Sequence, residues 1–79
     1  MKYDEEKIDE IVLALLYLTS EAEEYVTRAW KSQDWGVLNR LHEKGFISDP
    51  KTKARSVALS EEGSKLSKEL FIKHFGIKE

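Results

Sequence analysis

The side chains best suited to chemical recognition lie in the middle third of this chain. Some of them could contact nucleic-acid bases, because Asn or Gln pairs with adenine and Arg with guanine in the major groove. Others are loop cations that could contact phosphates or enter a narrow minor groove. The candidate base-contacting residues are Gln33, Asn39 and Arg40, and the candidate phosphate-contacting residues are Lys51, Lys53 and Arg55.

Both sets also have an ordinary structural explanation. The helix face that carries Asn39 and Arg40 could be a plain solvated face, and Glu43 on the same face would repel phosphate. The loop lysines could protect an exposed strand edge from pairing with another chain. The two interpretations of the helix face are evenly balanced, whereas the alternation of three cations favours the functional interpretation of the loop.

Enzymatic and metal chemistry find no support in the sequence. The absence of cysteine excludes disulfides and thiolate metal sites. His42 and Glu43 begin like a zinc-protease motif, but Phe46 stands where the second histidine belongs. Trp30 and Trp35 are predicted to be packing anchors of a small core. We therefore expect a protein that is not an enzyme, with no metal, no cofactor and no small-molecule substrate.

Length and charge narrow the class of protein. The 79 residues predict a single domain over residues 1–79, whose core is marginal because so short a chain buries only about 60% of its surface. The net charge of −2 argues against a generic nucleic-acid coat. Residues 1–25 hold two basic and eight acidic side chains, whereas residues 26–59 hold seven basic and three acidic ones. Contact with phosphate is therefore expected from the middle third.

The apolar segments are too short for a membrane protein. The longest apolar run, residues 11–18, is far below the roughly 20 residues that a membrane span needs. The first residues lack the order of a signal peptide, and the lack of cysteine fits a reducing compartment. We expect a cytoplasmic protein with no membrane partner.

Capping signals predict three helices. Asp4 is suited to begin the first, Asp34 begins one that runs to Lys44, and Ser60 begins a last helix that Gly76 stops. Between the first two, residues 20–23 fit a capping box and predict a further helix over about residues 21–29. One long helix over residues 4–30 is the alternative, because no Gly or Pro interrupts that stretch.

Residues 46–59 predict a hairpin. A strand begins at Phe46 and Ile47, Asp49 and Pro50 start a turn, and residues 55–59 return as a second strand. The predicted fold is therefore α+β and mainly helical. It is winged helix-turn-helix-like, with three to four helices and one β-hairpin between the last two helices.

The first helix is apolar on most of its circumference, which indicates burial on all sides. In so small a domain we favour burial against a second copy, and hence a homodimer. A central core helix wrapped by the others is the alternative. The predicted interface residues are Ile8, Ile11, Leu13, Leu16 and Tyr17.

Two resemblances cover these segments. Residues 38–47 and 57–63 resemble the recognition helix and wing of MarR-type and PadR-type regulators, which implies a winged-helix fold. This chain lacks their longer flanking helices and the Asp-x-Arg pair usual in their wing. Residues 28–31, 34–35, 38–47, 49–50 and 53–57 are more closely similar to a small bacterial domain family of unknown function. That resemblance spans nearly the whole chain and brings no activity with it.

The leading functional hypothesis is a transcription-regulatory protein that binds double-stranded DNA. The rival hypothesis is a protein-interaction module on a winged-helix scaffold that binds no nucleic acid, because fold alone does not specify function. The acidic N-terminal third motivates this rival.

Overall fold

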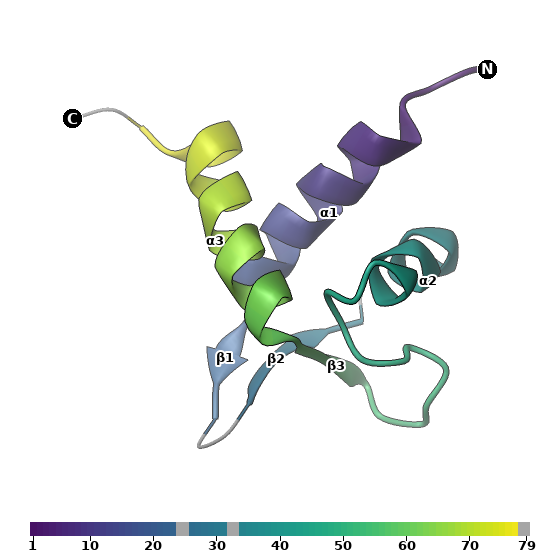
Figure 1. The fold of residues 1–79 in the computed structure, drawn as a ribbon, viewed down its shortest axis with the longest axis vertical. Helices are drawn as coiled ribbons and strands as arrows, with labels where there is room; N and C mark the ends of the chain where they lie inside the picture. The colour runs from purple at the N-terminus through teal and green to yellow at the C-terminus, as the bar shows by residue number, and fades with distance from the viewer. Residues whose placement is uncertain (24–25, 32–33, 78–79) are drawn as a thin grey trace.

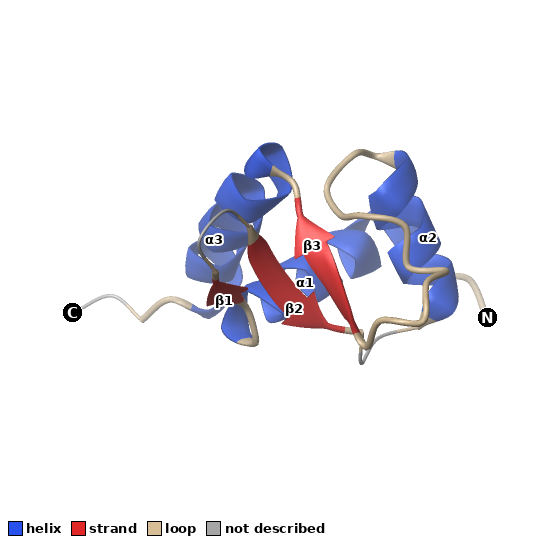
Figure 2. Cartoon of the chain, turned by 90° about the horizontal axis from the view of Figure 1, so that it is seen from below, coloured by secondary structure: helices blue, strands red, loops and turns tan. Residues whose placement is uncertain are grey.

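The computed structural model describes residues 1–23, 26–31 and 34–77, which form three helices and a three-stranded antiparallel sheet. Helices account for about half of the chain, so the predicted α+β class is confirmed. In Figure 2 the sheet faces the viewer, α1 and α3 lie behind it, and α2 lies beside it. The elements follow in the order α1 (Glu5–Leu18), β1 (Glu21–Ala22), β2 (Thr27–Trp30), α2 (Trp35–Glu43), β3 (Ser56–Leu59) and α3 (Glu61–Phe75) (Figure 1).

The three capped helices begin where the sequence predicts them. The side chain of Asp4 accepts a hydrogen bond from the backbone of Lys7, and that of Asp34 accepts from the first turn of α2. The Oγ of Ser60 accepts from the backbone N–H of Gly63 at 2.9 Å. Each cap satisfies a backbone donor that the helix itself leaves unpaired, which explains why these starts were readable from local sequence.

The segment after α1 corrects the prediction. Residues 21–22 and 27–30 form the paired antiparallel strands β1 and β2, so both the separate helix over residues 21–29 and the single long helix over residues 4–30 are wrong. Ser20 does not begin a new helix, because its Oγ donates to the carbonyl of Tyr17 at 2.7 Å and closes α1 instead. With β1 and β2 in this place, the described residues do not supply the helix that a helix-turn-helix requires before α2.

The predicted hairpin over residues 46–59 is only partly formed. β3 lies where it was expected, but its ladder partner is β2, through four antiparallel residue pairs. Ile47 contributes one isolated bridge to Leu59, and the backbone N–H of Ser48 donates to Ala58 at 2.8 Å. The long connection between Ile47 and β3 therefore runs mostly as a loop.

The core lies between the three helices and the inner face of the sheet, and it buries the first helix within the domain. Leu13 and Leu16 are each 1% exposed, so two of the predicted dimer-interface residues are buried within the chain's own domain. Ile8, Ile11 and Tyr17 are half-buried. The buried apolar residues are Val12, Leu13, Ala14, Leu16, Ala29, Val37, Leu38, Leu41, Ile47, Val57, Leu59 and Leu70.

No helix in the described ranges is both long and apolar enough to cross a membrane.

The start of α3 packs directly on the segment that follows α2. The backbone N–H of Ser60 donates to the carbonyl of Phe46 at 2.9 Å, and the Ser60 hydroxyl donates to the carbonyl of Gly45 at 2.6 Å. Gly63 is buried against the same place, where a Cβ would overlap the Phe46 carbonyl group. The backbone of Gly63 is helical, so glycine is required here by the close approach of Phe46 and not by an unusual backbone conformation.

We expect Gly63→Ala to lower the free energy of unfolding by about 2 kcal/mol, because overpacking outweighs the helix propensity that alanine adds. Urea denaturation followed by circular dichroism measures the change. Lys65→Ala, at an exposed position of the same helix, is the control and should change stability by less than about 0.5 kcal/mol. Unchanged or increased stability of the Gly63 variant would show that the two segments are not packed this closely.

Candidate functional site

A buried carboxylate on α1 organises the charged side chains of α2. Asp9 is 2% exposed, and the Nε–H of Arg40 is shared between its two carboxylate oxygens at 3.0 and 2.9 Å while the Arg40 Nη2 donates to Oδ1 at 2.8 Å. The Nζ of Lys44 donates to the other side of the carboxylate at 3.0 Å. Glu5 lies 3.4 Å from the Arg40 guanidinium at the rim. Two charges of α2 thus converge on one charge of α1.

The cations of this cluster keep Asp9 ionised. Burial alone would raise the pKa of Asp9, but the hydrogen bonds and charges of Arg40 and Lys44 together outweigh burial and hold that pKa below its ordinary value of 3.8. The hydrogen bond to Asp9 in turn raises the pKa of Arg40. The cluster is therefore a charged clasp between α1 and α2.

The clasp engages Arg40, one of the three residues predicted to contact bases. Arg40 is already bound to Asp9, so a contact from it to a base would have to break the clasp. Asn39 is half-buried on α2, and Gln33 lies outside the described residues. Of the predicted base-contacting residues that the structure describes, Asn39 is therefore half-buried and Arg40 is engaged by Asp9.

We expect Asp9→Asn to lower the free energy of unfolding at pH 7 by about 2 kcal/mol, since charge-assisted hydrogen bonds are removed while Arg40 and Lys44 can turn to water. A depressed carboxyl pKa stabilises the fold above the unfolded-state pKa, and this stabilisation is lost as the pH falls through the folded-state pKa. The difference between wild type and variant should therefore shrink below about pH 4. Urea denaturation over a pH series tests this.

Glu5→Gln serves as the control for this experiment, because the pair it forms with Arg40 is largely exposed and should be worth less than about 0.5 kcal/mol. A difference between the Asp9 variant and wild type that stays constant down to about pH 2 would contradict an ionised clasp.

The two tryptophans are exposed, which corrects their predicted role as packing anchors. Trp30 is 58% and Trp35 is 57% exposed. In β2 the buried residue is Ala29, so strand alternation turns Trp30 to the outer face of the sheet. Trp35 is the first residue of α2 and lies one turn before the buried Leu38. Residues 27–30 read Thr-Arg-Ala-Trp, which has no alternation of polar and apolar residues, so local sequence carries no signal for the exposure of Trp30.

Lys31 links the Trp35 ring to the loop over residues 49–55. Its backbone N–H donates to the carbonyl of Arg55 at 2.9 Å and extends the β2–β3 ladder. Its Nζ donates to the carbonyl and Oγ1 of Thr52 at 3.0 and 3.1 Å, and lies 5.9 Å from the centre of the Trp35 ring. One side chain therefore joins β2, α2 and the loop.

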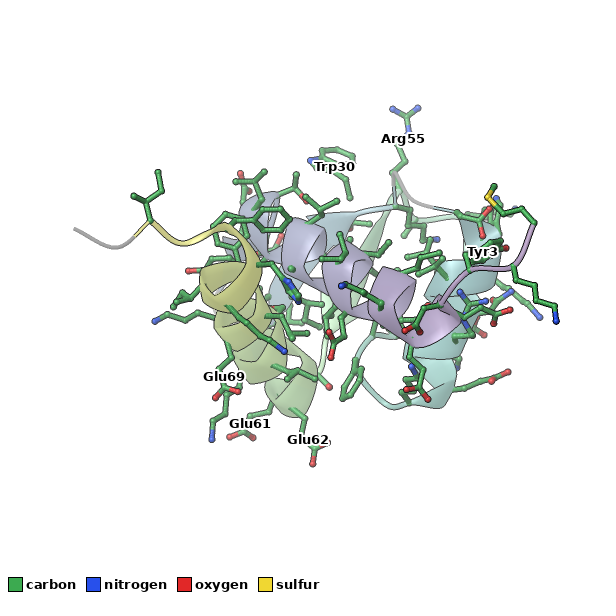
Figure 3. The ribbon with its side chains drawn as sticks, turned by 90° about the horizontal axis from the view of Figure 1, so that it is seen from above. Tyr3, Trp30, Arg55, Glu61, Glu62 and Glu69 are labelled. Atoms are coloured by element: carbon green, nitrogen blue, oxygen red, sulfur yellow. The ribbon has the colours of Figure 1, made fainter. Side chains whose placement is uncertain are left out.

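These side chains line an open cleft, which we call the tryptophan cleft. Its volume is about 540 Å³, within the roughly 300–1,000 Å³ of ligand pockets. Trp30 and Arg55 project from the same side of the molecule, whereas Glu61, Glu62 and Glu69 of α3 project from the opposite side (Figure 3). The residues that line the cleft are Trp30, Lys31, Trp35, Thr52, Ala54 and Arg55.

The predicted loop cations lie at or next to this cleft. Arg55 lines it, and Lys51 and Lys53 are exposed on the same loop. A hydrogen bond from the backbone of Lys51 to the Asp49 carboxylate, at 2.9 Å, shapes the turn, and Pro50 is fully buried beneath it. The loop is therefore anchored while its cations face water.

The outer face of the sheet continues the same surface. Arg28 lies two residues before Trp30 in β2 and so shares its face. Its Nε donates to the Oγ of Ser56 at 2.8 Å and its Nη2 to the Ser56 carbonyl at 3.0 Å. Arg28 of β2 is thus hydrogen-bonded to β3 on the face of the sheet that carries Trp30.

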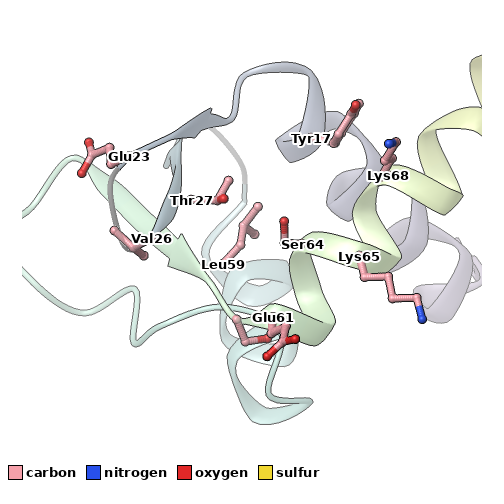
Figure 4. A pocket seen from close by; sticks show the side chains of 10 residues that line it. Tyr17, Glu23, Val26, Thr27, Leu59, Glu61, Ser64, Lys65 and Lys68 are labelled. Carbon is pink, nitrogen blue, oxygen red and sulfur yellow. The ribbon is translucent and has the colours of Figure 1, made fainter.

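A second hollow, of about 730 Å³, lies between the β1–β2 hairpin and the first half of α3 (Figure 4). Glu23 and Glu61 line it together with Lys65 and Lys68, so its charges are mixed and favour neither an anion nor a cation. In the part of the chain that the structure describes, no group of three or more His, Asp or Glu side chains is placed to hold a metal ion.

The structure defines a small α+β domain whose antiparallel sheet is covered on one face and bears an aromatic and cationic cleft beside the other. Residues 4–77 match the family described as a domain of unknown function (DUF6429), and the chain belongs to this family. It is similar to the uncharacterized protein y4hR of Sinorhizobium fredii (strain NBRC 101917 / NGR234), with 49% identity over 75 residues that cover 95% of this chain and 97% of the relative. No solved structure matches the chain.

The predicted resemblance to a small family of unknown function is thereby confirmed, and the bacterial source of the relative fits it. The winged-helix part of the resemblance gains no support from the order of elements, since a hairpin stands between α1 and α2.

Proposed function

We propose that this domain binds nucleic acid through the tryptophan cleft and the cationic loop beside it. The observation that carries the proposal is the gathering of two half-exposed tryptophans with Lys31 and Arg55 around one cleft. Aromatic rings offer stacking surfaces to bases, and cations offer contacts to phosphates, so the two kinds of side chain together suit a nucleic acid.

The charge distribution supports this assignment in a protein whose net charge is −2. Acidic side chains of α3 project away from the side that carries Trp30 and Arg55 (Figure 3). The loop over residues 49–55 holds three cations and one acid, Asp49. A polyanion approaching from the cleft side therefore meets a locally positive surface, and screening weakens repulsion from more distant acids.

The proposal keeps the loop half of the DNA-binding hypothesis and gives less weight to the helix half. The loop cations are exposed, as a phosphate contact requires. Arg40, in contrast, is held by a buried carboxylate. We therefore assign affinity to the cleft and loop, and we do not assign base-specific reading to α2.

Replacing Lys51, Lys53 and Arg55 together by Gln should weaken nucleic-acid binding by at least about tenfold at low salt, because phosphate contacts dominate affinity. The slope of log affinity against log salt should also fall by about 0.7–0.9 for each phosphate that the variant no longer neutralises. Fluorescence anisotropy with labelled oligonucleotides at several salt concentrations measures both quantities.

The matched control replaces three α3 lysines, Lys65, Lys68 and Lys73, by Gln. It removes the same charge from another surface and should leave the salt slope unchanged. Absence of binding to any single- or double-stranded oligonucleotide at low salt, by wild-type protein shown to be folded by circular dichroism, would reject the proposed function.

Protein–protein association, including the predicted homodimer, is the second candidate function. It is favoured by exposed apolar side chains one turn apart at the C-terminal end of α3, where Ile72 is 58% and Phe75 44% exposed. Contiguous exposed apolar surface is typical of interaction sites.

A homodimer through this surface should give twice the monomer mass in light scattering at micromolar concentration, and Ile72→Glu should return it to monomer mass. A monomer mass for the wild type would reject self-association.

A further inference from the structure

We infer that the bound nucleic acid is single-stranded and that its unpaired bases stack on Trp30 and Trp35. This inference rests on the proposed function and narrows it to one class of strand. It concerns the two rings themselves, whereas the proposed function depends mainly on the loop cations.

The exposure of both rings is the first reason. More than half of each tryptophan is open to water. Base faces in a duplex are already stacked on one another, so a duplex offers only groove edges and phosphates to such rings. An unpaired strand offers base faces, and aromatic rings bind these without regard to base identity because every base has a π-face.

The rigidity of the rings' supports is the second reason. Trp30 ends a strand and pairs with Ser56 of β3 in the antiparallel register. Trp35 begins α2, and the Lys31 ammonium lies over its ring at 5.9 Å while it is also bound to Thr52. The backbone of Trp30 and the ring of Trp35 are thus held in place before any ligand arrives, which reduces the ordering that binding requires.

The surroundings of the cleft are the third reason. Trp30 stands on the outer face of an antiparallel sheet beside Arg28, and sheets with exposed aromatic side chains are a known platform for unpaired bases. Arg55 lines the same cleft and can contact the backbone of a strand whose bases lie on the rings.

The test compares three forms of one oligonucleotide of about 12 nucleotides, within the range of single-strand site sizes. They are the single strand, its duplex, and a strand that carries abasic sites but the same phosphates. We expect the single strand to bind at least about tenfold more tightly than the duplex or the abasic strand. Intrinsic tryptophan fluorescence should be quenched by the single strand, and much less by the abasic one.

Two variants locate the effect. Trp30→Leu and Trp35→Leu should each weaken single-strand binding about tenfold while leaving the salt slope unchanged, because they remove stacking and no phosphate contact. Replacement of either ring by Phe should restore part of the affinity. Thermal unfolding monitors the fold of each variant, and the comparison of oligonucleotides on wild-type protein decides the question even if a variant unfolds.

The outcomes separate this inference from the proposed function. Equal binding of duplex and single strand, or of intact and abasic strands, would overturn the stacking inference while the proposed function stands. Binding of no oligonucleotide at all would overturn both. Tighter binding of the intact single strand together with quenching would support both.

Discussion

Four residue pairs between β2 and β3 hold together segments that lie nearly thirty positions apart in the chain. The same pairing acts on both faces of the sheet. On the inner face it sets Ala29 beside Val57 against the core, and on the outer face it sets Trp30 beside Ser56. One step further, Lys31 donates to Arg55 and carries the register into the cleft. Core and cleft therefore depend on a single antiparallel register, and a slip by one residue would exchange their side chains.

The second constraint is electrostatic and acts at the other end of α2. Asp9 is buried and ionised, so it requires both cations that converge on it, and those cations belong to α2. The clasp therefore sets where α2 lies against α1, and Trp35 is the first residue of that helix. Burying a lone carboxylate is costly, whereas burying one with paired, hydrogen-bonded partners is tolerated. Trp35 forms one wall of the tryptophan cleft, so the position of that wall depends on the Asp9 carboxylate, which binds Arg40 and Lys44 near the other end of α2.

These two constraints explain which parts of the molecule could be predicted from the sequence. The helix starts at Asp4, Asp34 and Ser60 were readable because a cap acts over three residues. The location of β3 and the exposure of the loop cations were readable from alternation and turn residues. The hairpin after α1 was not, because the capping pattern at Ser20 is a local signal whereas the partner that makes residues 27–30 a strand is β3, far along the chain.

The site residues differ from their predicted roles for the same physical reason. Sequence alone presents Arg40 as free, because its partner Asp9 lies 31 positions earlier and no spacing rule joins the two. Large aromatic residues usually belong to the core, yet the core of this domain is filled from the three helices and the inner face of the sheet, and the tryptophans lie outside it. Composition indicates how much apolar surface a chain carries. Which part of that surface stays exposed is decided by the register of the strands and by the face that each helix buries.

That remaining surface is informative in a chain of this size. A domain of 79 residues has little apolar area to spare for stability, and two tryptophans are among its largest apolar side chains. Leaving more than half of each ring in water forgoes part of the burial that would otherwise stabilise the fold. Such exposure is understandable where a ligand covers the rings, since binding to the folded state then returns stability by mass action. The cations around the rings indicate the sign of that ligand's charge, and the flat faces of the rings indicate its shape.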